Sequence, residues 1–217
     1  MRSSRTLRRG AAGLGTAVAA GTAVAAGYPL LLRRRCLTWG AEPDEVRAPM
    51  PGDDLLRGAP LVTTRAVTVD APPKAVWPWL VQMGPGRGGA YTYDWIENLF
   101  GLNMHSADRI LPEFQDLRVG DSFAMGNGPR LRVEILDPEA ALVLRSEDGA
   151  WVWAFGLIPR DAAADATRLI SRNRIAAPPS GPVSRALFRY VMEPGSLVME
   201  RKMLLGIKQR VERPADP

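Results

Sequence analysis

One stretch of this 217-residue chain, residues 61–83, constrains its fold more than any other. Its first half, residues 61–69, is rich in β-branched side chains, and its even-numbered positions hold small or β-branched side chains that alternate with a more varied odd-numbered set. This two-residue period is typical of a half-buried strand. Asp70 is then a candidate helix cap, and Pro72 and Pro73 suit a first helical turn, because the N–H that proline lacks would be unpaired there anyway. Hydrophobic residues follow at helical spacing over 76–83. The stretch therefore predicts a strand that leads directly into a short helix.

Strand patterns recur in the second half of the chain. A partly helical stretch over 93–100 comes first and ends at Gly101. Alternating or β-branched segments separated by turn residues then follow at residues 122–125, 131–136, 141–146, 151–159 and 167–175. Together with the first strand, they predict a curved antiparallel sheet of about six strands.

The chain closes with helical sequence. Residues 183–192 form one candidate segment, and residues 196–211 form a longer one. Between them, Glu193, Pro194 and Gly195 are expected to interrupt the helix. We therefore predict an α+β fold with a long C-terminal helix packed on the sheet.

Three segments carry a resemblance to a known family. They are VDAPPKAVWPWL over 69–80, GGAYTYDWIEN over 88–98 and MERKMLLGIK over 199–208. With the element order, they make residues 61–211 similar to the SRPBCC superfamily of START-type lipid-transfer and polyketide cyclase/dehydrase-like domains. The middle segment resembles a mark of its membrane-anchored bacterial members. The resemblance implies a helix-grip fold around a cavity, and it implies no single activity because this superfamily hosts carriers, cyclases, hydroxylase subunits and regulators.

The N-terminal region predicts a membrane anchor. Residues 10–32 carry no charge and end at an arginine triplet, 33–35, and this length can cross a bilayer core of about 30 Å. A cleaved signal peptide and a peripheral leader are the alternatives. The apolar run continues past the candidate cleavage site at 23–25, which favours a single-pass transmembrane helix.

The remaining boundaries follow from composition. We expect a basic N-terminus over 1–9, the anchor over 10–32, a linker over 33–60 and one globular domain over 61–213. Prolines and glycines are expected to break regular structure in the linker. Cys36 is the only cysteine, so an intramolecular disulfide is impossible, and this favours a cytoplasmic globular domain.

Charge and composition exclude several function classes. The formal net charge is +5, but the first 35 residues hold seven arginines and no acid, so the rest carries 21 basic and 23 acidic side chains. A nucleic-acid partner is therefore not expected, because such binding needs a basic face on the folded domain. His105 is the only histidine, and the chain has no zinc spacing, P-loop or dinucleotide fingerprint, so we expect neither a metal nor a cofactor.

Two aromatic groups are candidate ligand-binding residues. Rings with polar tips occur at Tyr91, Tyr93 and Trp95, where they could line a cavity mouth or pack a helix onto the sheet. The alternating residues Trp151, Trp153 and Phe155 share one face of a strand and form either an aromatic cavity wall or core.

Candidates for proton transfer are few, and no catalytic residue is assigned. His105 has an ordinary pKa near neutrality, although a lone histidine in a turn is more often a capping or surface residue. Asp94 and Glu97 share a helix face, which suits either paired acid–base chemistry or a solvated face with a cap at Asp94.

The sequence thus leads to one favoured hypothesis and two alternatives. The favoured hypothesis is a membrane-tethered domain that binds a hydrophobic small molecule, such as a lipid, an isoprenoid or a polyketide, in an internal cavity. The alternatives are a cyclase- or dehydratase-like enzyme that uses the same cavity, and a non-catalytic interaction module with a filled core.

Overall fold

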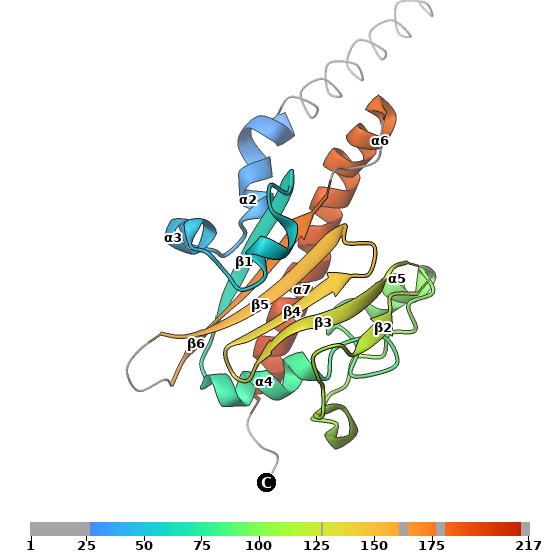
Figure 1. The fold of residues 1–217 in the computed structure, drawn as a ribbon. Coiled ribbons are helices and arrows are strands. Elements are labelled where there is room, and N and C mark those ends of the chain that lie inside the picture. Colours follow the sequence, from blue (N-terminus) through green and yellow to red (C-terminus); the bar gives the residue numbers. More distant parts are fainter. Residues whose placement is uncertain (1–26, 127, 161–164, 177–180, 214–217) are drawn as a thin grey trace, which may run out of the picture.

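The computed structural model describes residues 27–126, 128–160, 165–176 and 181–213, and Figure 1 shows an α+β fold. Its centre is one twisted antiparallel sheet in the order β1-β6-β5-β4-β3-β2. The strands are β1 (Leu61–Val69), β2 (Ser122–Ala124), β3 (Arg130–Asp137), β4 (Ala141–Ser146), β5 (Trp151–Pro159) and β6 (Thr167–Ile175). The six expected strands are therefore confirmed, and the arrangement is consistent with a helix-grip fold.

The sheet is built so that β1 and β2 form its opposite edges. The last strand, β6, lies between β1 and β5, and Arg65 on β1 pairs with Ser171 on β6. Between β3 and β4 the register shifts near Val133, where a bulge bends the strand. The first and last strands of the domain, β1 and β6, are thus neighbours at one edge of the sheet, whereas β2 forms the other edge.

The long C-terminal helix crosses one face of the sheet (Figure 1). It is α7 (Glu193–Val211), and it continues directly from α6 (Pro182–Leu187) and η4 (Phe188–Met192). The expected interruption at 193–195 is wrong, because a π-helical turn, η4, precedes Pro194 and the helix continues through it. Such a turn accommodates a residue that cannot donate a backbone hydrogen bond.

Two short helices complete this layer. They are α4 (Pro73–Val81), which follows β1 as predicted, and α5 (Asp94–Leu99); the short η3 (Pro112–Phe114) precedes β2. Asp70 does not cap α4, because Pro72 holds the cap position with no side-chain bond. Instead, Asp70 donates its N–H to the carboxylate of Glu212 at 2.6 Å and ties the turn to the end of α7.

The main hydrophobic core lies between the sheet and α7. Leu131, Leu142, Phe155 and Leu169 from the strands pack there, together with residues of α4 and α7 such as Leu204. Their alternation along each strand places every second side chain on this inner face. The core therefore follows the period that the sequence predicts.

Residues 38–60 cover the outer face of the sheet and are not an extended linker. They contain α3 (Pro43–Arg47) and η2 (Asp53–Leu56), and Met50, Leu55 and Leu56 pack on Val143, Val152 and Ala154. Arginines on the outer face of β6 bind this segment: Arg168 pairs with Glu45, and Arg172 pairs with Asp53 at 2.8 Å. The expected break of regular structure here is wrong because these contacts fold the segment onto the sheet.

The first described residues form η1 (Tyr28–Leu32) and α2 (Arg33–Leu37), which lie beside the start of α7. Residues 1–26, which hold most of the expected anchor, lie outside the described residues. Among the helices that the structure describes, none combines the length and the apolar character needed to cross a bilayer.

Candidate ligand-binding site

A cavity of about 460 Å³ lies between the inner face of the sheet and the N-terminal half of α7. This volume falls within the usual range of small-molecule sites, roughly 300–1,000 Å³. Its apolar wall is mainly aromatic rings and methionines: Phe123, Met125, Trp151, Trp153, Met199 and Met203. Methionine side chains adapt to ligands of different shape, so this wall suits an apolar molecule.

Two tryptophans of β5 form a rigid part of this wall. The rings of Trp151 and Trp153 stack with centroids 5.5 Å apart and planes 19° apart. Each indole N–H donates to the neighbouring strand, that of Trp151 to Asn173 Oδ1 and that of Trp153 to Ser171 Oγ, both at 2.9 Å. These bonds fix the rings, so the flat faces are preorganised for contact with a ligand.

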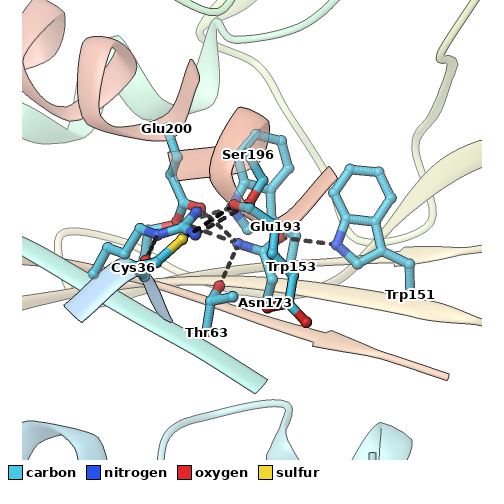
Figure 2. A network of polar contacts seen from close by, with 10 residues as sticks. Cys36, Thr63, Trp151, Trp153, Asn173, Glu193, Ser196 and Glu200 are labelled. Atoms are coloured by element: carbon cyan, nitrogen blue, oxygen red, sulfur yellow. Dashed lines mark hydrogen bonds and ion pairs between the residues drawn. The ribbon is translucent and has the colours of Figure 1, made fainter. Parts of the chain in front are cut away.

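A buried polar network forms the end of the cavity near β1 and β6 (Figure 2). Arg65 is fully buried and its guanidinium donates to the carboxylate of Glu200 on α7 and to Ser196 Oγ at 3.0 Å. Asn173 donates to both Glu200 oxygens at 3.2 Å and to Thr63 Oγ1 at 3.3 Å. The network therefore joins β1, β6 and α7 through one buried ion pair.

The ionisation of Glu200 is set by opposing effects. Burial raises the pKa of Glu200, whereas Arg65, Ser171 and Asn173 oppose this shift by charge and hydrogen bonding. A buried carboxylate needs such partners, because an isolated charge in this environment is costly. Arg65 and Asn173 therefore use their donors on Glu200 rather than presenting them to a ligand.

A second acidic residue is paired at the start of α7. Glu193 accepts two bonds from Arg33, at 2.8 and 2.9 Å, and one from the Tyr28 hydroxyl at 3.2 Å. The thiol of Cys36 donates to the Glu193 carbonyl at 3.3 Å, and the Cys36 carbonyl accepts from Arg65. The segment around α2 is thus bonded to both the helix and the network beside the cavity.

Polar groups of a different kind lie on the α5 side of the cavity. Thr92 and Glu97 line it, Glu97 is buried with 8% exposure, and neither Thr92 Oγ1 nor Glu97 Oε2 has a hydrogen-bond partner among the described residues. Burial raises the pKa of the Glu97 carboxyl, hydrogen bonding with the nearby Thr92 side chain opposes this rise, and the negative charge of Asp94 adds to it. Glu97 is therefore a buried acid whose hydrogen-bonding capacity is not used up by the fold.

The structure brings two of the six aromatic candidates to the cavity wall, Trp151 and Trp153. Phe155 follows them on the same face but is buried in the core, with its ring 4.9 Å from that of Trp153. Tyr91 is also a core residue, because its ring packs on Trp79 and its hydroxyl donates to the Trp79 carbonyl at 2.9 Å. Burial raises the pKa of Tyr91 far above its ordinary value.

The other candidates lie at the surface or in turns. Trp95 is 67% exposed, and Tyr93 is exposed with Lys202 Nζ 5.8 Å from its ring centroid. His105 is exposed as well. Asp94 accepts from Ser106 N and Oγ at 2.7 and 2.6 Å, so its carboxylate holds the irregular segment 102–107. Neither His105 nor Asp94 lines the cavity: His105 is exposed, and the carboxylate of Asp94 is bonded to Ser106.

Of the polar residues that line the cavity, the sequence singles out Glu97 but not the network of Arg65, Asn173 and Glu200. Arg65 lies in the same alternation phase as Leu61 and Val69, so a charged residue on the apolar face of the first strand was the available signal. Glu200 lies within the apolar stripe of the last helix and gives the complementary signal. Read together, the two opposite charges at buried positions predict a pair between strand and helix.

Comparison with known proteins gives fold-level similarity alone. No protein-family model matches the sequence, and no curated protein matches it. The solved structure of the KanY protein is 14% identical, with 72% of this chain and 100% of that chain covered at a TM-score of 0.45. A Mesorhizobium loti protein is also 14% identical (71% and 99% covered, TM-score 0.40), as is the Aha1 dimer from Colwellia psychrerythraea (70% and 96% covered, TM-score 0.39). At TM-scores below 0.5, these similarities identify neither a family nor a ligand.

Proposed function

We propose that this protein binds a hydrophobic small molecule in the cavity between its sheet and α7. The observation that carries the proposal is the cavity of about 460 Å³ with an aromatic and methionine wall. Burying an apolar ligand against such a wall is favourable by roughly 25 cal/mol per Å² of apolar surface removed from water. A lipid, an isoprenoid or a polyketide-like molecule has the required character.

We also propose that the chain is a member of the SRPBCC superfamily with a helix-grip fold. Support comes from the element order β1, α4, α5, five further strands and α7, together with the three sequence segments that resemble this superfamily. The cavity lies where the superfamily resemblance leads one to expect it, between sheet and terminal helix.

A membrane tether would keep this cavity close to ligands dissolved in the bilayer. Exposed apolar side chains gather on α6 and η4, where they include Val183, Leu187 and Val191, and Leu31 and Leu32 are exposed on η1. The two segments are neighbours, because the rings of Tyr28 and Tyr190 lie 5.8 Å apart. Surface-exposed arginines would attract anionic headgroups: Arg185 and Arg189 lie on α6 and η4, and Arg34 and Arg35 lie on α2, directly after η1.

The tether and the side of the membrane have direct tests. Membranes from cells that produce the full-length chain would be washed with alkaline carbonate, and we expect the protein to stay in the membrane pellet. Protease added to intact cells should leave the globular domain uncut if it is cytoplasmic. Release into the wash would overturn the single-pass tether, and cleavage from outside would overturn the cytoplasmic placement.

Ligand binding is tested on the purified full-length protein. We expect native mass spectrometry to find a co-purifying lipophile, and we expect Nile red to bind saturably. Met199→Trp places a large ring in the cavity from α7, so it should weaken Nile red binding. Val198→Trp is the matched control because Val198 is the preceding residue and is 52% exposed. Equal binding by both variants would contradict a ligand in this cavity.

A catalytic use of the same cavity is the second candidate function. Glu97 favours it, because a buried carboxyl with a raised pKa on an apolar wall is the type of group that serves as a general acid. Loss of turnover in Glu97→Gln, with Nile red binding retained, would support a cyclase- or dehydratase-like enzyme. The cavity itself argues against the third alternative, an interaction module with a filled core.

A further inference from the structure

The polar side chains that line the cavity differ sharply in how well they are bonded. Arg65, Asn173 and Glu200 bond one another at one end, and Glu193 is bonded by Arg33. Ser146 and Asp148 also line the cavity and bond each other at 2.6 Å. These groups have their hydrogen-bond partners within the protein, so a ligand need not supply a polar group to pair with them.

Thr92 and Glu97 are the exception among the described cavity-lining residues. Thr92 Oγ1 and Glu97 Oε2 are buried and make no hydrogen bond of standard geometry with any described residue. The Thr92 side chain is nevertheless the hydrogen-bonding neighbour that lowers the pKa of Glu97 against the rise caused by burial, so the two side chains approach each other at one site. A buried acceptor that stays unpaired is unfavourable, and native proteins rarely keep one without a reason. A ligand group that donates to Glu97 would remove this penalty.

The position of Glu97 defines where on the ligand this group must lie. Glu97 is on α5, near the β2 edge of the sheet, whereas Arg65 and Glu200 are at the β1 edge (Figure 1). Trp151 and Trp153 lie on β5, which is between these two edges in the strand order, and Met199 and Met203 line the same cavity from α7. The cavity therefore offers a long apolar surface with one unsatisfied polar site toward its α5 side.

The chemistry of this site favours a hydroxyl over an ionic group. A hydroxyl both donates and accepts, so it can pair with Glu97 Oε2 and Thr92 Oγ1 together. An ammonium group would have to lose its hydration to enter an apolar cavity, and a carboxylate ligand would be repelled by Glu97 once it ionises.

We infer that the natural ligand is an alcohol, with an apolar body against the tryptophan and methionine wall and a hydroxyl bonded to Glu97 and Thr92. This inference rests on the proposed ligand-binding function and goes further by naming the polar group of the ligand and its partner residues. The specificity would arise because an ether or an alkane cannot donate a hydrogen bond to Glu97 Oε2, which costs affinity.

The test compares isomeric probes that differ only in the donor. Purified full-length protein would be titrated with 1-octanol and with heptyl methyl ether, and tryptophan fluorescence would report occupancy because Trp151 and Trp153 line the cavity. We expect 1-octanol to bind about tenfold more tightly, which is the ratio for one hydrogen bond to a buried group. Glu97→Leu should bring the two affinities together, and Glu97→Gln, which still accepts a hydrogen bond, should keep part of the preference.

Controls separate this inference from the binding proposal. Asp94→Asn on the same helix is the matched control, because Asp94 bonds Ser106 and is absent from the cavity wall, so it should keep the preference for octanol. Equal affinities in the wild-type protein, with Nile red still bound, would overturn the alcohol ligand and leave the binding function standing. Tighter binding of octylamine than of octanol would also overturn it. Failure to bind Nile red or either probe would remove both.

Discussion

Arg65 on β1 and Glu200 on α7 form an ion pair in the buried space between the sheet and the helix. Both side chains are almost completely removed from solvent, and Asn173, Thr63 and Ser196 bond the same network (Figure 2). The pair joins the first strand of the domain to its last helix, and it forms one end of the cavity. It therefore links the closure of the fold to the shape of the candidate site.

Removing one member of this pair should be strongly destabilising. Arg65→Met leaves the Glu200 carboxylate buried without its cation, and Glu200→Leu does the same to Arg65. Losses of this kind cost about 3–5 kcal/mol. Urea unfolding of the full-length protein, followed by tryptophan fluorescence, would measure the free energy of unfolding of each variant.

The double variant Arg65→Met/Glu200→Leu is the control for that prediction. Because neither charge is then left unpaired, we expect it to be more stable than either single variant, since apolar replacement of a buried pair is often close to neutral. Additive losses in the double variant would mean that the two residues act independently, in contradiction to the pairing.

The segment that covers the outer face should be released by acid. Burial alone would raise the pKa of Glu45, but hydrogen bonds from Arg168 and from the Glu42 backbone lower it overall. The stability that this carboxylate contributes is present above its ordinary pKa of 4.5 and is lost as pH falls through the lowered folded value. Hydrogen exchange of residues 43–56 below pH 4.5 should therefore rise before global unfolding.

Glu45→Gln should produce the same release at neutral pH, with a loss of about 1–3 kcal/mol for a charged hydrogen bond of this kind. Asp44→Asn tests the specificity of the effect. Asp44 pairs with Arg47, but both side chains are largely exposed, so this change should cost almost nothing. Equal losses from the two variants would contradict a specific role for the contact of Glu45 with Arg168.

The strands and the last helix were predictable because their side-chain periods are local. Residues 61–69 and 151–159 alternate with a period of two, and each segment forms a strand within a residue or two of the expected bounds. In the last helix, Met203, Leu204 and Ile207 likewise pack into the core against the sheet. Such patterns depend on neighbours along the chain, so one sequence is enough to read them.

Contacts between distant residues were not predictable in the same way. Arginines on a strand of an antiparallel sheet ordinarily face solvent, yet Arg172 is buried and donates to the Ala48 and Glu45 carbonyls across the outer face. The composition of residues 38–60 indicates turns and charged side chains. It does not indicate that this segment packs on the outer face of the sheet. Likewise, the sequence leaves open whether Tyr91 lines a cavity mouth or packs a helix onto the sheet, and its hydrogen bond to the Trp79 carbonyl identifies it as a core residue.

Asp94 and His105, the two candidates for proton transfer, should differ in their effect on stability. Asp94→Ala removes both bonds to Ser106, from its N–H and its hydroxyl, and should cost about 1–3 kcal/mol. His105→Ala changes an exposed side chain and should stay within about 0.5 kcal/mol of the wild type. Thermal unfolding of the two variants would measure this difference, and a large loss from His105→Ala alone would contradict these placements.

Two glycines of α7 should respond to alanine with opposite signs. At Gly206, an added Cβ would lie 2.5 Å from the Tyr91 carbonyl oxygen and 3.0 Å from the Tyr91 Cβ. Tyr91 cannot easily move away, because its φ of 58° is held by bonds to Trp79 and Ser106. We expect Gly206→Ala to destabilise the protein by about 1–3 kcal/mol, since overpacking outweighs the gain in helix propensity.

Gly195 is the matched position on the same helix. It lies within the continuous helix of residues 182–211 and has no atom within 4 Å of its ideal Cβ among the neighbours counted. Gly195→Ala should therefore stabilise the protein by about 0.5–1 kcal/mol, because alanine loses less backbone entropy than glycine on entering a helix. Urea unfolding of both variants tests the close approach of α7 to Tyr91. Stabilisation by Gly206→Ala would show that the helix does not pack against Tyr91 as closely as described.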